Sequence, residues 1–148
     1  MENKWVNVYH DLIETLKKQG RPVGAFKSLV IKKHYTNEKV ENCGWKYCRH
    51  HIDEISISGS DLKAKPEYET GEAIIVDVVE HSLLHYIIVC ANTTTPNHGM
   101  LLMFRAEDPL DTWEEFAKEG CKKFNIEFDE NWRENLADYI RFRSPLFN

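Results

Sequence analysis

The densest group of chemically reactive side chains lies in one nine-residue stretch in the first half of the chain. The stretch reads Cys43-Gly44-Trp45-Lys46-Tyr47-Cys48-Arg49-His50-His51. Its two thiols and two imidazoles are side chains that bind zinc in proteins. The spacing differs from that of an ordinary zinc loop, because both histidines follow the second cysteine at once. The stretch therefore indicates a zinc-stabilised module only if a further ligand comes from elsewhere in the chain.

A zinc site built from Cys43, Cys48 and His50 needs a fourth ligand. Adjacent side chains on an extended chain point to opposite faces, so His51 could not join the same site as His50. The candidates for the remaining position are His81, His85 and Cys90. In the simpler interpretation, the two cysteines pack as small apolar residues beside a strand. We expect this simpler arrangement, with no metal and no cofactor.

The same stretch also combines basic and aromatic side chains. Lys46 and Arg49 alternate with Trp45 and Tyr47, which is typical of surfaces that contact phosphates and stack on bases. Nucleic-acid-binding domains, however, are usually strongly basic, and this chain has a formal net charge of −5. The composition therefore argues against a nucleic-acid-binding module.

Histidine chemistry offers another hypothesis. His50, His51 and His85 could act in acid–base catalysis on a nucleotide or a phosphoester, because acids such as Glu54 lie close by in the sequence. None of the seven histidines falls in a nucleophile elbow, a phosphate-binding loop or a recognised metal motif. The sequence therefore assigns no catalytic residue, and it favours a binding protein over an enzyme.

The charge distribution carries the function that the sequence favours most. Residues 1–66 have a net charge of +4, whereas residues 107–138 hold eleven acidic and four basic residues and have a net charge of −7. Part of this excess belongs to an ordinary solvated helix face with acids in its first turn. The remainder would create a negative field that speeds the encounter with a cationic partner.

These observations favour a small acidic interaction protein that binds and neutralises a basic partner. An example of such a role is an immunity or antitoxin-like inhibitor of a toxin nuclease or another nucleic-acid-handling enzyme. Its partner-binding residues are expected to be the acids of the C-terminal part, namely Asp108, Asp111, Glu114, Glu115, Glu119, Glu130 and Glu134. The alternatives are the histidine-dependent phosphoester enzyme and the zinc-stabilised or nucleic-acid-binding module.

The hydrophobic pattern predicts one α+β domain over residues 1–148. Apolar residues at helical spacing predict an N-terminal helix over residues 4–18. Runs rich in β-branched and aromatic residues predict a largely antiparallel sheet of about five strands, over residues 26–36, 45–58, 72–80, 83–93 and 100–106. Asp108-Pro109 begins a helix that extends to about residue 124, and Asp129 begins a second C-terminal helix whose inner face would include Tyr139 and Ile140.

The location of the protein is predicted from what the sequence lacks. The first residues show no basic and apolar signal segment, and the longest apolar run spans the six residues 86–91. We therefore expect a cytoplasmic protein that does not contact a membrane. Its four cysteines would be free thiols in a reducing compartment, and its oligomeric state is left open.

Overall fold

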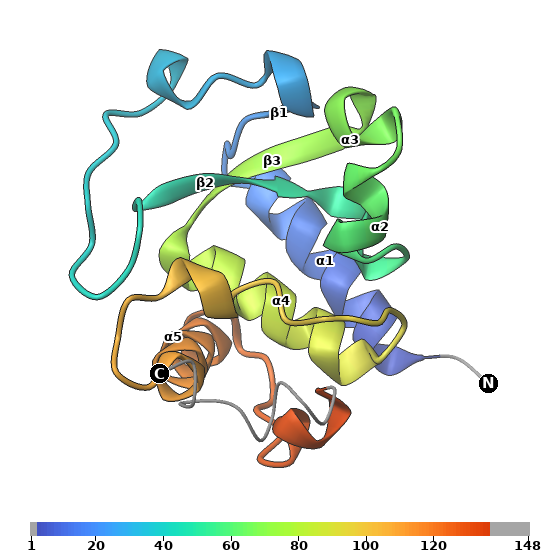
Figure 1. Cartoon of the computed structure of the whole chain (residues 1–148), viewed down its shortest axis with the longest axis vertical. Helices are drawn as coiled ribbons and strands as arrows, with labels where there is room; N and C mark the ends of the chain where they lie inside the picture. The colour runs from blue at the N-terminus through green and yellow to red at the C-terminus, as the bar shows by residue number, and fades with distance from the viewer. Residues whose placement is uncertain (1–2, 137–148) are drawn as a thin grey trace.

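The structure is a computed structural model, and it describes residues 3–136 (Figure 1). A small sheet lies between two layers that the chain builds on its opposite faces. One layer contains the long helices, and the other is the segment that follows the first strand. None of the helices in this range is long and apolar enough to cross a membrane.

The first helix, α1 (Lys4–Lys18), begins and ends where the sequence predicts. The side chain of Asn3 accepts a hydrogen bond from the backbone N–H of Trp5 and so caps the helix. One face buries apolar residues at helical spacing, namely Trp5, Tyr9, Leu12, Ile13 and Leu16. This face packs on the central helix, where burial of its side chains stabilises the fold.

Within residues 3–136, the sheet has three strands instead of the five expected. They are β1 (Val23–Ala25), β2 (Tyr47–His51) and β3 (Glu72–Asp77), with β3 in the centre and both pairings antiparallel. The prediction of a largely antiparallel α+β fold is thus confirmed, and the number of strands was wrong. Residues 26–36 form two short 3₁₀ turns, η1 (Phe26–Ser28) and η2 (Ile31–Lys33), and residues 100–106 contain only η4 (Leu101–Met103).

The largest error concerns the strand expected over residues 83–93, because residues 83–91 are helical. Helix α4 (Val78–Ala91) follows β3 without a loop, because Asp77 both ends the strand and caps the helix in a reciprocal pair with Glu80. Nearly every residue of α4 is buried. A helix that is surrounded by protein on all sides is apolar all round, so it lacks the periodic stripe that identifies surface helices.

The C-terminal part agrees with the sequence over its first helix. Helix α5 (Pro109–Phe124) is capped by Asp108, has proline at its first position and ends at Asn125 in the left-handed conformation, as expected for a helix of this sequence. In place of the second C-terminal helix, the structure shows the 3₁₀ turn η5 (Trp132–Asn135). Tyr139 and Ile140 lie outside the described residues.

The two faces of the sheet pack against different parts of the chain. Ile74 and Val76 of β3 belong to the main core with α1 and α4, whereas Ala73 and Ile75 face a smaller cluster around Leu29. Short elements join β2 to β3, namely η3 (Ile52–Ile55), α2 (Gly59–Lys63) and α3 (Glu67–Thr70). In Figure 1, α4 crosses below β2 and β3, with α2 near the opposite end of β2 from the β3–α4 junction. This arrangement brings histidines of β2 and α4 together.

Candidate metal site

Three buried histidines from two elements meet at the interface of the sheet and the central helix. His50 comes from β2, and His81 and His85 come from α4. One candidate ligand atom from each ring lies within 4.8 Å of those of the other two. A tetrahedral zinc ion holds neighbouring nitrogen ligands about 3.4 Å apart, since each Zn–N bond is about 2.0–2.1 Å. Small ring movements would therefore close the three imidazoles around one ion.

The order of the elements explains why these rings converge. His81 and His85 are four residues apart on a helix, so they lie one turn apart on the same face. His50 pairs in register with Ile74 of β3, whose side chain faces the helices. Because α4 continues directly from β3, the strand pair and the helix form one unit, and its inner surface carries all three rings.

A hydrogen bond to the hydroxyl of Tyr9 of α1 fixes the tautomer of His50. The Tyr9 hydroxyl donates its single proton to the carbonyl oxygen of Ile52 at 2.7 Å, and it also lies 2.8 Å from Nε2 of His50. Since the hydroxyl proton is already used, Nε2 of His50 must be the donor in the second contact. Nδ1 of His50 then carries a lone pair, and it is buried without a hydrogen-bond partner. Metal-binding histidines are commonly oriented in this way by a hydrogen bond at the other ring nitrogen.

Burial favours the neutral, metal-binding form of His50 and His81. Burial lowers the pKa of His50 and of His81 well below the ordinary value, and the neighbouring imidazoles, His85 first, lower both further. Nδ1 of His81 is also buried and without a partner. Two unpartnered ring nitrogens in one buried cluster are unusual, because buried polar atoms normally have hydrogen bonds.

A carboxylate stands beside the three rings. The same oxygen of Glu54, Oε2, lies 3.5 Å from Nδ1 of His50 and 3.5 Å from Nε2 of His85. Burial opposes the ionisation of Glu54, but the nearby imidazoles, His85 first, lower the pKa of its carboxyl group overall. The carboxylate and Nδ1 of neutral His50 are both electron-rich, with no hydrogen between them. A cation placed among these atoms would turn this repulsion into attraction.

The cluster is accessible from a groove of about 390 Å³. His81, His85 and Glu54 contribute to its wall, together with two basic side chains, Arg49 and Lys63. Structural zinc sites are closed by protein ligands, whereas catalytic sites keep one position open to solvent or substrate. The groove thus gives this cluster the access that a catalytic site requires.

His51 lies on the wall of the same groove and is held by a different set of contacts. Its Nε2 lies 2.8 Å from the backbone oxygen of Tyr68, which can only accept, so Nε2 carries the proton and Nδ1 the lone pair of the neutral ring. Its ring stacks on Phe26 with the centroids 4.0 Å apart, and the guanidinium of Arg49 covers the ring of Phe26 at 3.8 Å. These contacts hold His51 in one orientation beside the cluster.

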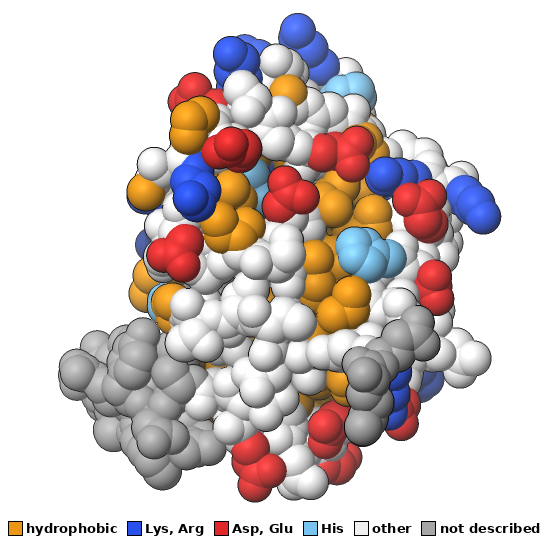
Figure 2. Space-filling view, turned by 90° about the vertical axis from the view of Figure 1, so that its right-hand side faces the viewer, with side chains coloured by type: hydrophobic (Ala, Val, Ile, Leu, Met, Phe, Trp, Pro, Cys, Tyr) orange, Lys and Arg blue, Asp and Glu red, His pale blue; other side chains and the backbone are white. Residues whose placement is uncertain are grey.

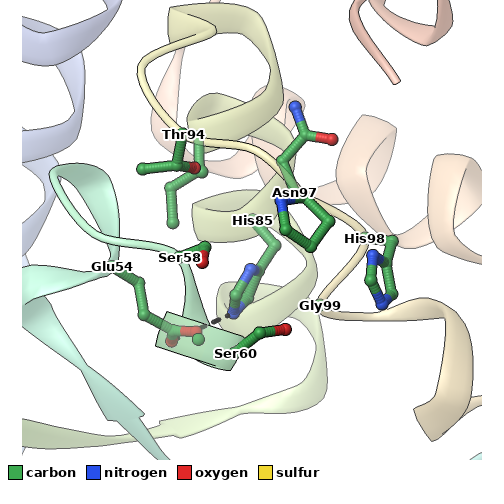
Figure 3. Close-up of a pocket in the computed structure, with 11 residues that line it drawn as sticks. Glu54, Ser58, Ser60, His85, Thr94, Asn97, His98 and Gly99 are labelled. Carbon is green, nitrogen blue, oxygen red and sulfur yellow. Dashed lines mark ion pairs between the residues drawn. The ribbon is translucent and has the colours of Figure 1, made fainter. Parts of the chain in front are cut away.

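A smaller side cavity of about 60 Å³ adjoins the groove at Glu54 and His85 (Figure 3). In Figure 3, Ser58 and Ser60 lie near Glu54, and His98 lies on the other side of the His85 ring. Burial, and to a smaller extent His85, lowers the pKa of His98, whose Nδ1 is buried without a partner.

The structure brings together only some of the ligands considered from the sequence. His50, His81 and His85 form the group that could hold an ion, and within residues 3–136 neither Cys43, Cys48 nor Cys90 belongs to such a group. The four cysteines are free, as expected. The separation of His50 from His51 to different sides of the strand is also as expected, because only His50 joins the cluster.

The acids expected to bind a partner lie on and after α5, and several have internal contacts. Asp108 caps the helix, Asp111 and Glu114 pair with Arg133, and Glu114 also pairs with Lys118. The remaining members of the set are exposed, namely Glu115, Glu119, Glu130 and Glu134. The acidic interaction surface stays a prediction, which now depends most on the exposed carboxylates of Glu115, Glu119 and Glu130.

Two sequence signals could have revealed the site. Asp77 and Glu80 have the spacing of a helix capping box, which marks a helix start immediately before His81. Once α4 is helical, His81 and His85 have the four-residue spacing that places two metal ligands on one helix face. Glu54 gives no such signal, because its position depends on the 3₁₀ turn η3 after β2.

The chain was also compared with known proteins. No protein-family model matches it, and neither a curated protein nor a solved structure shows significant similarity to it.

Proposed function

We propose that this protein is a metal-dependent hydrolase that holds a zinc-like divalent ion with His50, His81 and His85 and acts on phosphoesters. The observation that carries the proposal is the meeting of three buried imidazoles and one carboxylate at an open groove. Imidazole nitrogen suits zinc and the neighbouring transition metals better than magnesium or calcium, which prefer oxygen.

The groove supports a role for the ion in chemistry. A zinc ion with three protein ligands lowers the pKa of its bound water to about 7 and so supplies hydroxide at neutral pH. Glu54 adjoins two of the three ligand rings, and its carboxylate would be the group that accepts a hydrogen bond from a water bound to the ion. His51 lines the groove and uses Nε2 to contact the backbone oxygen of Tyr68, which leaves Nδ1 without that contact, so His51 is our candidate for the proton transfer that accompanies attack.

The charges around the groove favour an anionic substrate. Arg49 and Lys63 are basic side chains of its wall, and among the described residues that line it Glu54 is the one acid. Beyond the groove, Lys27, Lys32 and Lys33 are exposed on and around η1 and η2. Figure 2 shows basic side chains at the top of the view, the end of the molecule that holds η1 and η2 in Figure 1. A phosphodiester fits such surroundings better than a neutral ester does.

Metal content tests the first half of the proposal. Protein stripped with a chelator and reloaded with zinc should retain one ion per chain after desalting, measured by elemental mass spectrometry. His81→Ala and His85→Asn should each lose this ion, whereas His34→Ala, at an exposed histidine outside the cluster, should keep it. Far-ultraviolet circular dichroism shows that each variant is folded. A folded wild-type protein without stoichiometric zinc, manganese, cobalt or nickel would refute the proposal.

Hydrolysis of bis(4-nitrophenyl) phosphate and of a labelled oligonucleotide tests the second half. Glu54→Gln and His51→Gln should keep the metal and lose at least about 100-fold in kcat, because proton-transfer groups contribute about 10²–10⁴-fold. Lys63→Met should mainly raise KM for the oligonucleotide. Equal rates for the metal-loaded wild type and His51→Gln would exclude His51 from the reaction.

A further inference from the structure

The space around the proposed metal position has two parts with different chemistry. The groove and the side cavity share part of their walls, including Glu54, Ser60, His85 and His98. The groove carries the cations Arg49 and Lys63. The side cavity contains neither of them, and its wall combines hydroxyl groups with uncharged or apolar side chains, namely Ser58, Ser60, Thr94, Pro96, Asn97 and Ile88.

We infer that the side cavity is a subsite for a small, uncharged, hydroxyl-bearing group of the substrate, next to the bond that is broken. This inference rests on the proposed function, because it places the phosphoryl group in the groove and the hydroxyl-bearing group beyond the metal. A sugar hydroxyl attached to the phosphate is the chemical group of this kind. The cavity would thereby fix the direction in which the substrate lies and select for hydroxylated substrates.

Size and charge both support this assignment. A cavity of about 60 Å³ holds a few water molecules or a group of a few heavy atoms. A second phosphate there would meet the carboxylate of Glu54 without any basic side chain to compensate for the repulsion. A hydroxyl group would instead meet the hydroxyls of Ser60 and Thr94, which can both donate and accept hydrogen bonds.

His98 adds a polar atom in need of a partner. Its Nδ1 is shielded from solvent and has no hydrogen-bond partner among the described residues, although its ring lines both parts of the site. An unpartnered buried nitrogen is costly unless a ligand satisfies it. A substrate hydroxyl in the side cavity is therefore a candidate partner for this nitrogen.

Not every hydroxyl of the cavity is suitable for a test. The Ser58 side chain accepts a hydrogen bond from the backbone of Asp61 and caps α2, so its removal would also destabilise that helix. The side chains of Ser60 and Thr94 do not cap α2. Ser60→Ala and Thr94→Val remove the two hydroxyls with little change of shape.

The experiment measures binding of three product-like ligands to the zinc-loaded protein by isothermal titration calorimetry. The ligands are methyl phosphate, 2-deoxyribose 5-phosphate and ribose 5-phosphate, which share the phosphate and differ in their hydroxyl groups. We expect ribose 5-phosphate to bind about threefold to tenfold more tightly than methyl phosphate, because this is the gain in affinity expected from one or two neutral hydrogen bonds. The Ser60→Ala/Thr94→Val double variant should lose this difference. Thr94→Val alone, at a residue that lines the side cavity and not the groove, should still bind methyl phosphate like the wild type.

The outcomes separate the two proposals. Equal affinities for the three ligands, or an unchanged preference in the double variant, would overturn the subsite and leave the metal-dependent function intact. A protein that fails to retain zinc would refute the proposed function itself. Lys63→Met serves as the matched control, because it should weaken all three ligands alike and keep their order.

Discussion

Gly99 offers the sharpest structural test of the metal site. A Cβ atom at this position would lie 2.6 Å from Cε1 and 2.8 Å from Nδ1 of the His85 ring. Ordinary contacts of a Cβ atom begin at 3.4 Å, so Gly99→Ala requires the loop and the ring to separate by about 0.8 Å. The ring is closely surrounded by His50, His81 and Glu54, which limits its freedom to retreat.

The expected effect of Gly99→Ala follows from the tolerance of metal bonds. Metal–ligand distances hold to within about 0.2 Å, and loss of a supporting contact typically lowers metal affinity by about 10–100-fold. We therefore expect zinc affinity to fall by at least tenfold, measured by competition with a chromophoric chelator. Gly24→Ala is the control, since its Cβ would meet only Leu29 at an ordinary 3.7 Å. Wild-type zinc affinity in folded Gly99→Ala would show that the His85 ring is not held where the structure places it.

The other predictions concern the supports of the site and the rest of the chain. Tyr9→Phe leaves the Nε2–H of His50 without its acceptor. The free energy of unfolding in urea should therefore fall by about 1–3 kcal/mol, and zinc affinity should fall by about tenfold. Unchanged zinc affinity would argue against the assigned tautomer of His50. Burial raises the pKa of Cys90 and of Cys121 to about 12, so neither thiol should react with iodoacetamide at pH 8 until the protein unfolds, as mass spectrometry of peptides would show. A hydrogen bond from the Arg133 guanidinium lowers the pKa of Asp111 below 3.8, although desolvation partly opposes this shift. The resulting stabilisation of the fold is present above pH 3.8 and is lost as the pH falls through the lower pKa of the folded state. The stability difference between wild type and Arg133→Met should therefore shrink when urea unfolding at pH 7 is repeated near pH 3, and a constant difference would contradict this linkage.

The sequence predicted a helix correctly where one face of the helix is exposed to solvent or where a capping residue marks its first turn. The stripe from Trp5 to Leu16 defined α1, and Asp108-Pro109 defined the start of α5. It failed for α4, because a central helix with apolar residues on every side resembles a buried strand in its composition. That one error placed His85 on a strand and His81 in the connection before it, and so concealed their shared helix face.

The sequence predicted the histidines of the candidate site, but it did not predict how the fold brings them together. His50, His81 and His85 were all considered as ligands or acid–base groups, but the sequence joined His50 to Cys43 and Cys48, its neighbours along the chain. Residues that are close in sequence on a strand alternate between faces, whereas the true companions of His50 come from about 30 residues later. Only the pairing of β2 with β3, followed at once by α4, brings them together.

The junction at Asp77 and Val78 has a consequence for how this chain can change. Where most connections between elements absorb insertions in a loop, here the last residue of the strand is also the cap of the helix. One additional residue at this point would turn the helix by about 100° about its axis relative to the strand. Both α4 imidazoles would then turn away from His50. Any variant of this chain that keeps the site must therefore keep the same number of residues between β3 and His81.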